Sequence, residues 1–468
     1  MDRSARMRNQ HIGKLLWNFS LPTIVGMLVS SLYNVIARIF VGRGIGSLAI
    51  AATTVAFPIM ILLMAVSLLI GVGATALISL KLGEQKKDEA EKVAGTAMTM
   101  LILLPAALAL LFLLFAEPIL ISFGASAAVL PYARDFTQII MLGSVFGSIS
   151  MGMNNFIRAE GNPAMAMYTQ ILGAVVSVAL NYVFIFIFHW GIKGSALATI
   201  LAQLISAIWV LSYFFTGRSL VKIHWKNLKP AWPVLSSIMA IGFAPFAMQT
   251  AACIQQLILN HTLMFYGGDL ALAAIGIVMS ISMLLVMPVL GLGQGAQPII
   301  GYNYGARQYQ RVRETWKTAV LAGTGIAVAG YLALHIWPLQ LVGLFSKGDT
   351  ALTTMTVHAM LTFFALLPVV GFQVVSSMYF QAVGKARQAA ILSLSRQFLI
   401  FIPLLLILPR FWGIDGVWRT APIADGLSVA LTAGFILFEM KKIRQEEAQE
   451  PRGGGGETTP SGTFENLA

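Results

Sequence analysis

Gly46-Ser-Leu-Ala-Ile-Ala-Ala52 returns 222 residues further along the chain as Gly268-Asp-Leu-Ala-Leu-Ala-Ala274. A common spacing at several separate positions indicates that the chain consists of two related halves. At an offset of 222, the other matches are Gly73-Ala with Gly295-Ala, Gly83 with Gly305, and Trp190-Gly-Ile-Lys-Gly194 with Trp412-Gly-Ile-Asp-Gly416.

The composition is that of a membrane protein. Of the 468 residues, 57% are hydrophobic and only 11% are charged, whereas soluble domains carry about 25% charged residues. This composition excludes a soluble enzyme, a nucleic-acid-binding protein and a disordered protein. The single cysteine, Cys253, excludes a disulfide framework, and no Cys/His cluster has zinc spacing. We therefore expect no metal and no cofactor.

Apolar stretches long enough to cross a bilayer occur twelve times, six in each half. Each crossing needs about 20 apolar residues, and backbone polar groups in lipid must bond within their own segment, so all twelve are expected to be helices. The sequence predicts an all-α polytopic protein. The predicted spans are 15–41, 49–80, 93–115, 133–157, 164–188, 192–215, 234–265, 271–300, 315–338, 356–380, 389–408 and 415–438.

Lysine and arginine predict the orientation of these helices. The two chain ends and the loops after even-numbered spans contain 23 of the 31 basic residues, and the opposite loops and adjoining span ends contain 7. By the positive-inside rule both termini are cytoplasmic. The net charge of +12 is therefore a topology signal, and we expect a lipid bilayer and no nucleic acid as partner.

The repeat divides the chain into two lobes. Because each half has an even number of spans, the halves have parallel topology and are related by a pseudo-two-fold axis along the membrane normal. Proteins of this form transport a substrate bound between the halves near the midplane. The predicted parts are a cytoplasmic N-terminus (1–14), an N-lobe (15–215), a cytoplasmic linker (216–233), a C-lobe (234–440) and a disordered cytoplasmic tail (441–468).

Four motifs resemble the multidrug and toxic compound extrusion (MATE) family, in its bacterial DinF-like branch. They are Gln294-Gly-Ala-Gln-Pro-Ile-Ile-Gly-Tyr-Asn-Tyr-Gly-Ala306, Arg158-Ala-Glu-Gly-Asn-Pro163, Tyr379-Phe-Gln-Ala-Val-Gly384 and Leu32-Tyr-Asn-Val-Ile...Phe-Val-Gly-Arg-Gly44. The similarity covers nearly all of residues 10–440. It implies two six-helix lobes around a V-shaped cleft, in a monomer of the bacterial inner membrane. It also implies export of amphipathic, often cationic, small molecules by antiport with protons or sodium.

The N-lobe departs from the family pattern at its expected ion site. The resemblance implies an aspartate where this chain has Ala37, and an Asn-x-x-x-Asp pair where it has Ser177 and Asn181; the family's threonine is retained as Thr199. Amide and hydroxyl groups do not titrate, so this set cannot carry a proton. Neutral oxygens can hold sodium, but we expect a lower affinity without a compensating charge.

Asp425 and Arg396 are the ionisable residues furthest inside the predicted spans. A charge near the bilayer centre costs several kcal/mol, so both are candidates for function. They lie on neighbouring spans and could form a pair. One interpretation is a static ion pair between two helices; the other is that Asp425 accepts protons or attracts a cationic substrate.

Uncharged polar residues and methionines within the spans are the candidates for the cleft wall. Methionine and aromatic side chains give the adaptable surface that promiscuous binding sites use. The cleft candidates are Tyr33, Asn34, Met151, Asn154, Asn155, Gln255, Gln256, Met287 and Tyr379. The candidates for a cytoplasmic gate are Arg158, Glu160, Gln294, Gln297 and Asn303.

Several functions remain open at this level. The first is a secondary exporter working by alternating access. A flippase for lipid-linked or envelope precursors is the second, although such relatives often have about fourteen spans and several basic residues in the cleft. The loss of the N-lobe acids leaves a weakly coupled exchanger or a sensor as further alternatives. A membrane enzyme is disfavoured because no catalytic cluster is visible, so we expect no enzymatic activity.

Overall fold

The computed structural model describes residues 7, 10–45, 47–123, 125, 127–217, 219–346 and 350–449, and these residues form helices without any strand. The N-terminal half comprises α2 (Ile12–Gly44), α3 (Ser47–Gly83), α4 (Lys87–Leu114), α5 (Ala116–Ser122), α6 (Leu130–Ala159), α7 (Pro163–Tyr182), the π-helix η1 (Val183–Ile187) and α8 (Gly191–Phe215). The 3-10 helix η2 (Trp225–Leu228) lies in the connection. The C-terminal half comprises α9 (Trp232–Gly305), α10 (Tyr309–Ile336), α11 (Pro338–Ser346), α12 (Thr350–Phe363), α13 (Leu367–Ala382), α14 (Ala386–Leu394), the π-helix η3 (Ser395–Phe401), α15 (Ile402–Trp412) and α16 (Ile414–Gln449).

Eleven helices of this set are long and apolar enough to span a membrane, and a bent helix pair makes a twelfth. The long helix α9 is two spans, because Gly268 interrupts it with φ 63° and ψ −159°, a conformation that favours glycine. The predicted break between residues 265 and 271 is thus confirmed. The all-α membrane fold of the sequence prediction is also confirmed.

The internal repeat is visible in the backbone itself. Adding 222 to both ends of α4 gives the two ends of α10. Gly191 and Gly413, each preceded by a tryptophan in the matched motifs, have φ angles of 57° and 56°. Gln85 and Arg307, also 222 residues apart, have positive φ angles of 63° and 56°. The two halves therefore share helix lengths and turn conformations.

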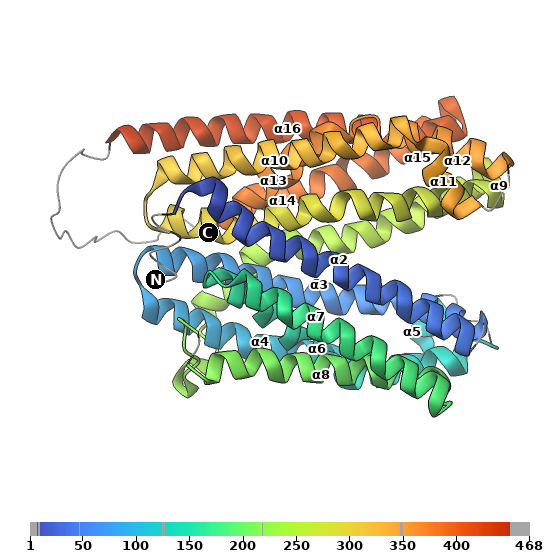
Figure 1. Cartoon of the computed structure of the whole chain (residues 1–468), viewed down its shortest axis with the longest axis horizontal. Coiled ribbons are helices and arrows are strands. Elements are labelled where there is room, and N and C mark those ends of the chain that lie inside the picture. The colour runs from blue at the N-terminus through green and yellow to red at the C-terminus, as the bar shows by residue number, and fades with distance from the viewer. Residues whose placement is uncertain are drawn as a thin grey trace.

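The buried apolar residues form three cores, and their arrangement defines a V. One core contains residues of both lobes, from Met7 through Leu82 and Ile300 to Ile443. The other two are confined to single lobes, with residues from Val41 to Ala196 in one and from Leu259 to Ala424 in the other. The lobes are thus joined at the end where α2 begins and α16 ends, which we call the terminal end, and separate toward the opposite end (Figure 1).

Two sequence expectations require correction. The predicted span 356–380 is two helices, α12 and α13, bent by 51°. Pro368 in the first turn of α13 explains the bend, because proline has no backbone N–H and disfavours helical geometry in the preceding residue. The tail predicted to be disordered from residue 441 is helical through Gln449; residues 450–468 lie outside the described part of the chain.

Candidate functional site: the seam between the lobes and two polar clusters

The lobes meet at the terminal end along a seam in which glycines bring two backbones into contact. A Cβ atom on Gly83 would lie 2.1 Å from the carbonyl oxygen of Tyr302. A Cβ atom on Gly305 would also lie 2.1 Å from a carbonyl oxygen, that of Leu80. Gly83 and Gly305 are equivalent positions of the repeat, and so are Leu80 and Tyr302, so each contact is the repeat equivalent of the other. The seam therefore follows the pseudo-two-fold axis, and any larger side chain at either glycine would push the lobes apart.

A second set of glycines extends the seam toward the membrane centre. A Cβ atom on Gly73 would lie 2.1 Å from the carbonyl oxygen of Ile238, and one on Gly242 would lie 1.7 Å from that of Leu69. The equivalent position in the other half is Gly295, where a Cβ atom would lie 2.6 Å from the Ser20 hydroxyl oxygen. Each lobe's first helix, α2 or α9, thus packs against the opposite lobe at the terminal end.

Arg158 lies buried in the seam without a carboxylate partner among the described residues. Its Nη1 donates to the side-chain oxygen of Gln294 on the opposite lobe at 2.8 Å. With its amide turned to satisfy both neighbours, Gln170 accepts from Nη2 at 2.9 Å and donates to the Gly26 carbonyl at 3.1 Å. Two gate candidates are thus in contact across the lobes, and their gating role stays a prediction.

Glu160 serves a different purpose from its neighbour in the motif. It is fully buried, and its carboxylate accepts from the backbone N–H groups of Leu220 and Val221, each at 3.1 Å, and from the hydroxyls of Ser219 and Tyr213. Burial raises the pKa of the Glu160 carboxyl, although these four donors act in the opposite direction. Glu160 therefore holds the connection between the lobes.

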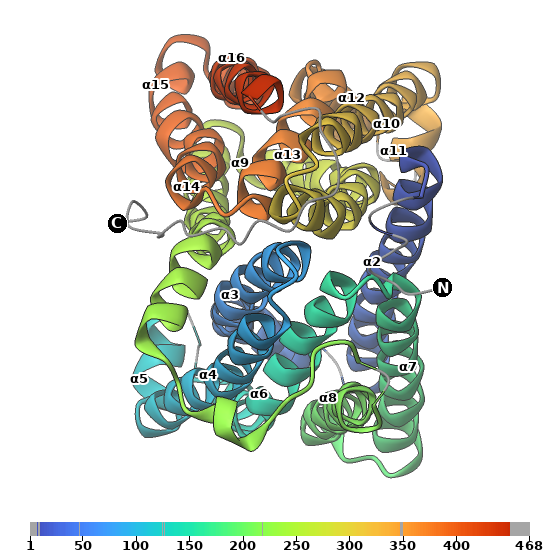
Figure 2. The same cartoon turned by 90° about the vertical axis from the view of Figure 1, so that its left-hand side faces the viewer.

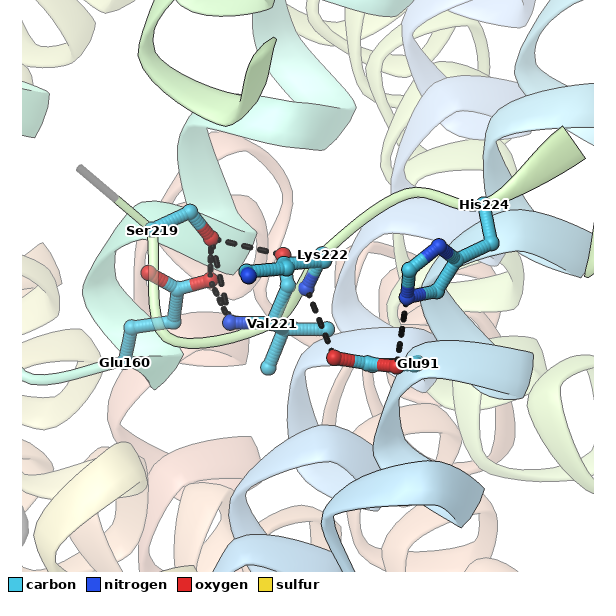
Figure 3. A network of polar contacts seen from close by, with 6 residues as sticks. All are labelled: Glu91, Glu160, Ser219, Val221, Lys222 and His224. Atoms are coloured by element: carbon cyan, nitrogen blue, oxygen red, sulfur yellow. Dashed lines mark hydrogen bonds and ion pairs between the residues drawn. The ribbon is translucent and has the colours of Figure 1, made fainter. Parts of the chain in front are cut away.

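Glu91 on α4 continues this network along the connection, residues 219–231, which we call the connecting strap (Figure 3). Its carboxylate accepts from the backbone N–H of Lys222 at 3.1 Å and lies 3.2 Å from Nε2 of His224. About two helical turns further along α4, the Thr99 hydroxyl donates to the Leu228 carbonyl at 2.7 Å. The strap that leads into the C-lobe is thus attached to the N-lobe.

The segment that leads into the N-lobe is attached to the C-lobe in the same way. Asn303 donates to the Met7 carbonyl at 3.3 Å, and Arg311 donates to the carbonyls of Met7 and Gln10 at 3.1 and 2.7 Å. Asn303 therefore holds the N-terminal segment, while the remaining gate candidate, Gln297, is buried on α9. At the terminal end, each lobe binds the segment that precedes the first helix of the other.

The expected ion site of the N-lobe is a closed set of neutral hydrogen bonds. Asn181 is fully buried; its amide donates to the Ser177 carbonyl at 2.8 Å, and its side-chain oxygen accepts from Ser195 at 2.9 Å. The hydroxyl of Thr199 donates to the Ser195 carbonyl at 3.0 Å, within its own helix. Ala37 on α2 is partly buried and offers no polar atom. The amide and hydroxyls at this site are thus satisfied by one another.

The C-lobe contains the charged pair. Nε of Arg396 in the π-helix η3 donates to Oδ1 of Asp425 on α16 at 2.6 Å. The Asp425 side chain is 7% exposed and that of Arg396 is 32% exposed. One turn along α16, Ser428 accepts a hydrogen bond from the buried side chain of Gln373, whose own oxygen has no donor among the described residues. The predicted pair thus forms, beside a buried amide oxygen that remains available as an acceptor.

The cleft candidates differ in burial, and their place in a cleft stays a prediction. Tyr379 is fully buried and its hydroxyl donates to Glu439 at 3.2 Å, so it does not line an open cleft here. Asn154 is buried, and no donor to its side-chain oxygen is found in the described part of the chain. Gln256 is exposed and bonded to Asn260 on its own helix. The partly buried candidates are Tyr33, Met151, Asn155, Gln255 and Met287, and the side chain of Asn34 lies outside the described residues.

Sequence reasoning missed the residues whose partners are remote in the chain. Glu91 gave no signal because its strap partners are 131 positions away. Lys385 and Glu439, paired at 2.6 Å, are 54 positions apart. Ser195 could have been found from its position four residues before Thr199 on the same helix face. The gate motifs were found because they are contiguous.

The two lobes have parallel topology. They are joined at the terminal end by a seam whose contacts are equivalent under the repeat, and they are separate at the opposite end. This architecture is that of a two-lobe membrane transporter. The MatE family model matches residues 22–183 and 238–407, one segment in each lobe. The chain belongs to the MatE family, which consists of transporters.

Known relatives agree in length and fold. The chain is 28% identical over 428 residues to the multidrug export protein MepA of Staphylococcus aureus strain N315, covering 92% of this chain and 94% of that protein. It is 27% identical over 430 residues to the protein of the same name from Staphylococcus haemolyticus. Among solved structures, a MATE protein in the bent conformation aligns with a TM-score of 0.90 at 22% identity, covering 96% of this chain and 100% of that chain. An outward-facing multidrug resistance MATE family transporter aligns with a TM-score of 0.89 at 22% identity, covering 95% and 99%.

Proposed function

We propose that the protein is a multidrug exporter that moves amphipathic, mainly cationic, small molecules by alternating access. The observation that carries this proposal is the pair of glycine contacts, Gly83 with Tyr302 and Gly305 with Leu80, that the repeat exchanges. A seam of backbone contacts between two lobes with separate cores at the other end can open without unfolding either lobe. The similarity to multidrug export proteins supports the substrate class.

The orientation follows from the distribution of charge. With most basic residues at the terminal end, that end faces the cytoplasm of a bacterial inner membrane, and the described state is closed toward the cytoplasm. In this state the separate ends of the two lobes face outward, as expected for the release state of an exporter. We further propose that one chain is sufficient for transport, because each lobe supplies half of the seam.

Ion coupling is proposed to reside in the C-lobe. Asp425 is a buried carboxylate whose charge is balanced by Arg396 in this state. Protonation of Asp425, or its binding of sodium or a cationic substrate, would release Arg396 from the pair. The unpartnered oxygen of Gln373 lies on a residue bonded to the same face of α16 and adds an acceptor for a cation. The neutral side chains that are hydrogen-bonded around Asn181 contain no carboxylate at which a proton or a cation could replace a bound arginine.

The change Asp425→Asn tests the coupling proposal. The protein is reconstituted in liposomes, and a fluorescent organic cation is followed under a proton gradient, a sodium gradient and a membrane potential alone. We expect Asp425→Asn to reduce ion-driven flux to the level without a gradient, because an amide neither titrates nor balances a cation. The matched control is Asn181→Ala, which should retain ion-driven flux.

The same assay can reject each part separately. Undiminished gradient-driven flux in Asp425→Asn would place coupling elsewhere while leaving the exporter intact. Absence of flux in the unaltered protein under all three conditions would contradict export of cations, and lipid-linked precursors would be the next substrates to assay.

A further inference from the structure

The connecting strap is held from its inner side only. The carboxylates of Glu160 and Glu91 accept from its backbone N–H groups, and the Thr99 hydroxyl donates to one of its carbonyls. Gly95 on α4 allows a close approach, since a Cβ atom there would lie 2.4 Å from the carbonyl oxygen of Asn227. These contacts fix the strap backbone, and with it the positions from which the remaining side chains extend.

The outer side of the strap combines tryptophan with lysine. Trp225 is 86% exposed, and Trp232, at the first position of α9, is 74% exposed. Lys222, Lys226 and Lys229 are also exposed. The strap and the first residue of α9 thus present two exposed tryptophans and three exposed lysines.

Among the described residues, no ion pair joins Lys222, Lys226 or Lys229 to a carboxylate. The sequence contains no aspartate or glutamate between Glu160 and Asp269. The two carboxylates that contact the strap, Glu160 and Glu91, lie on its inner side and are occupied by hydrogen bonds (Figure 3). The three exposed lysines therefore give the strap a positive charge.

We expect the strap to lie at the depth of the lipid headgroups, because it connects two candidate membrane spans. It joins the end of α8 to the beginning of α9, and both are candidate membrane spans. In the view toward the terminal end it runs along the outer edge of the N-lobe (Figure 2). Tryptophan, with an apolar ring and one N–H donor, favours this interface, and lysine near it attracts anionic headgroups.

We propose that the outer side of the connecting strap is a binding site for anionic phospholipid. Lys222, Lys226 and Lys229 contact the phosphate groups, and Trp225 and Trp232 enter the interface between headgroups and acyl chains. The buried carboxylates Glu91 and Glu160 act behind this surface as the attachment that keeps the strap at the required depth. The proposal concerns lipid binding and is independent of the transported substrate and of ion coupling.

Lipid titration of the full chain in nanodiscs tests the charge requirement. Spin-labelled phosphatidylglycerol is added to a phosphatidylcholine bilayer, and the motionally restricted fraction is measured for the triple variant Lys222→Gln, Lys226→Gln, Lys229→Gln. We expect the affinity to fall about fivefold for each lysine removed. The matched control replaces Lys87, Lys92 and Lys317, three exposed lysines at the same end, with glutamine. Equal losses in both triple variants would show diffuse attraction and overturn the site.

Tryptophan quenching tests the location without altering any lysine. Brominated phosphatidylglycerol should quench the fluorescence of the protein more than brominated phosphatidylcholine at the same bromine content. Trp225→Phe should remove a substantial part of that difference, whereas Trp17→Phe, at an exposed tryptophan of α2, should leave it unchanged. Equal quenching by the two lipids, or an unchanged difference in Trp225→Phe, would overturn the proposal.

Discussion

Arg158 shows how a single side chain joins the two lobes. A guanidinium without a carboxylate partner is costly to bury unless neutral oxygens accept hydrogen bonds from its N–H groups. Gln294 and the reoriented Gln170 supply those oxygens from α9 and α7. Because Gln294 belongs to the other lobe, opening the terminal end removes one acceptor and exposes the charge to water. The same residue can therefore favour the closed seam and still tolerate the open one.

The Arg158–Gln294 contact predicts a measurable coupling between the two positions. Gln294→Ala should destabilise the closed seam because a buried cation loses an acceptor, and Arg158→Ala should cancel that loss because the cation is gone. The expected interaction energy is about 1.5–3 kcal/mol, the range for hydrogen bonds to charged groups. Unfolding midpoints of the unaltered protein, both single variants and the double variant give the value. Strict additivity would show that the two side chains do not interact.

At the scale of elements, the lobes contact through helix backbones rather than long side chains. The first helices α2 and α9 each pack on the opposite lobe at glycine positions, and the turns after α3 and α9 repeat the same geometry. Close backbone packing at small residues is typical of helix association in membranes, where apolar side chains gain little from leaving lipid. Such a seam has few interdigitated side chains to disengage, which suits a contact that must open and close.

Alanine at Gly83 or Gly305 should shift the protein away from the closed seam. The new methyl group would meet a backbone carbonyl, which cannot move independently of its helix, and overpacking of this kind costs about 1–3 kcal/mol. The closed population should fall about 5- to 150-fold relative to the open one. Distances between spin labels on the two lobes at the terminal end would measure the ratio of the closed to the open population. Gly276→Ala and Gly434→Ala, where the added atom meets nothing within 4 Å, are the controls and should leave the distances unchanged.

At the scale of the whole molecule, the three cores make the two lobes rigid and leave their mutual angle adjustable. The core shared by both lobes lies at the terminal end, and each lobe has its own core at the opposite end. Opening the terminal end requires the shared core to divide. The connecting strap is bound to the N-lobe, and the segment before α2 is bound to the C-lobe. When the terminal end opens, each segment must either move with that lobe or lose its hydrogen bonds to it.

A reversible cross-link across the terminal end should stop transport. With Cys253 replaced by serine, Gln85→Cys and Arg307→Cys place exposed thiols two residues after the seam glycines. Joining them with a flexible methanethiosulfonate reagent should abolish flux, and reduction should restore it. The control pair, Glu117→Cys with Arg134→Cys, lies within one lobe, where the two native side chains form an ion pair. Continued transport in the cross-linked seam variant would contradict alternating access through this end.

The sequence by itself determined the helices, their number to within one bent pair, and the repeat. These properties depend on local hydropathy, on prolines such as Pro368, and on glycines such as Gly268 whose φ angle other residues rarely adopt. The Asp425–Arg396 pair could be foreseen because the two charges lie on neighbouring spans with few alternatives. The tertiary structure alone decided that Glu160 and Glu91 bind the connecting strap, that Tyr379 is buried against Glu439, and that the seam is closed at the terminal end. Those contacts join residues far apart in the chain, and their geometry depends on how whole helices pack.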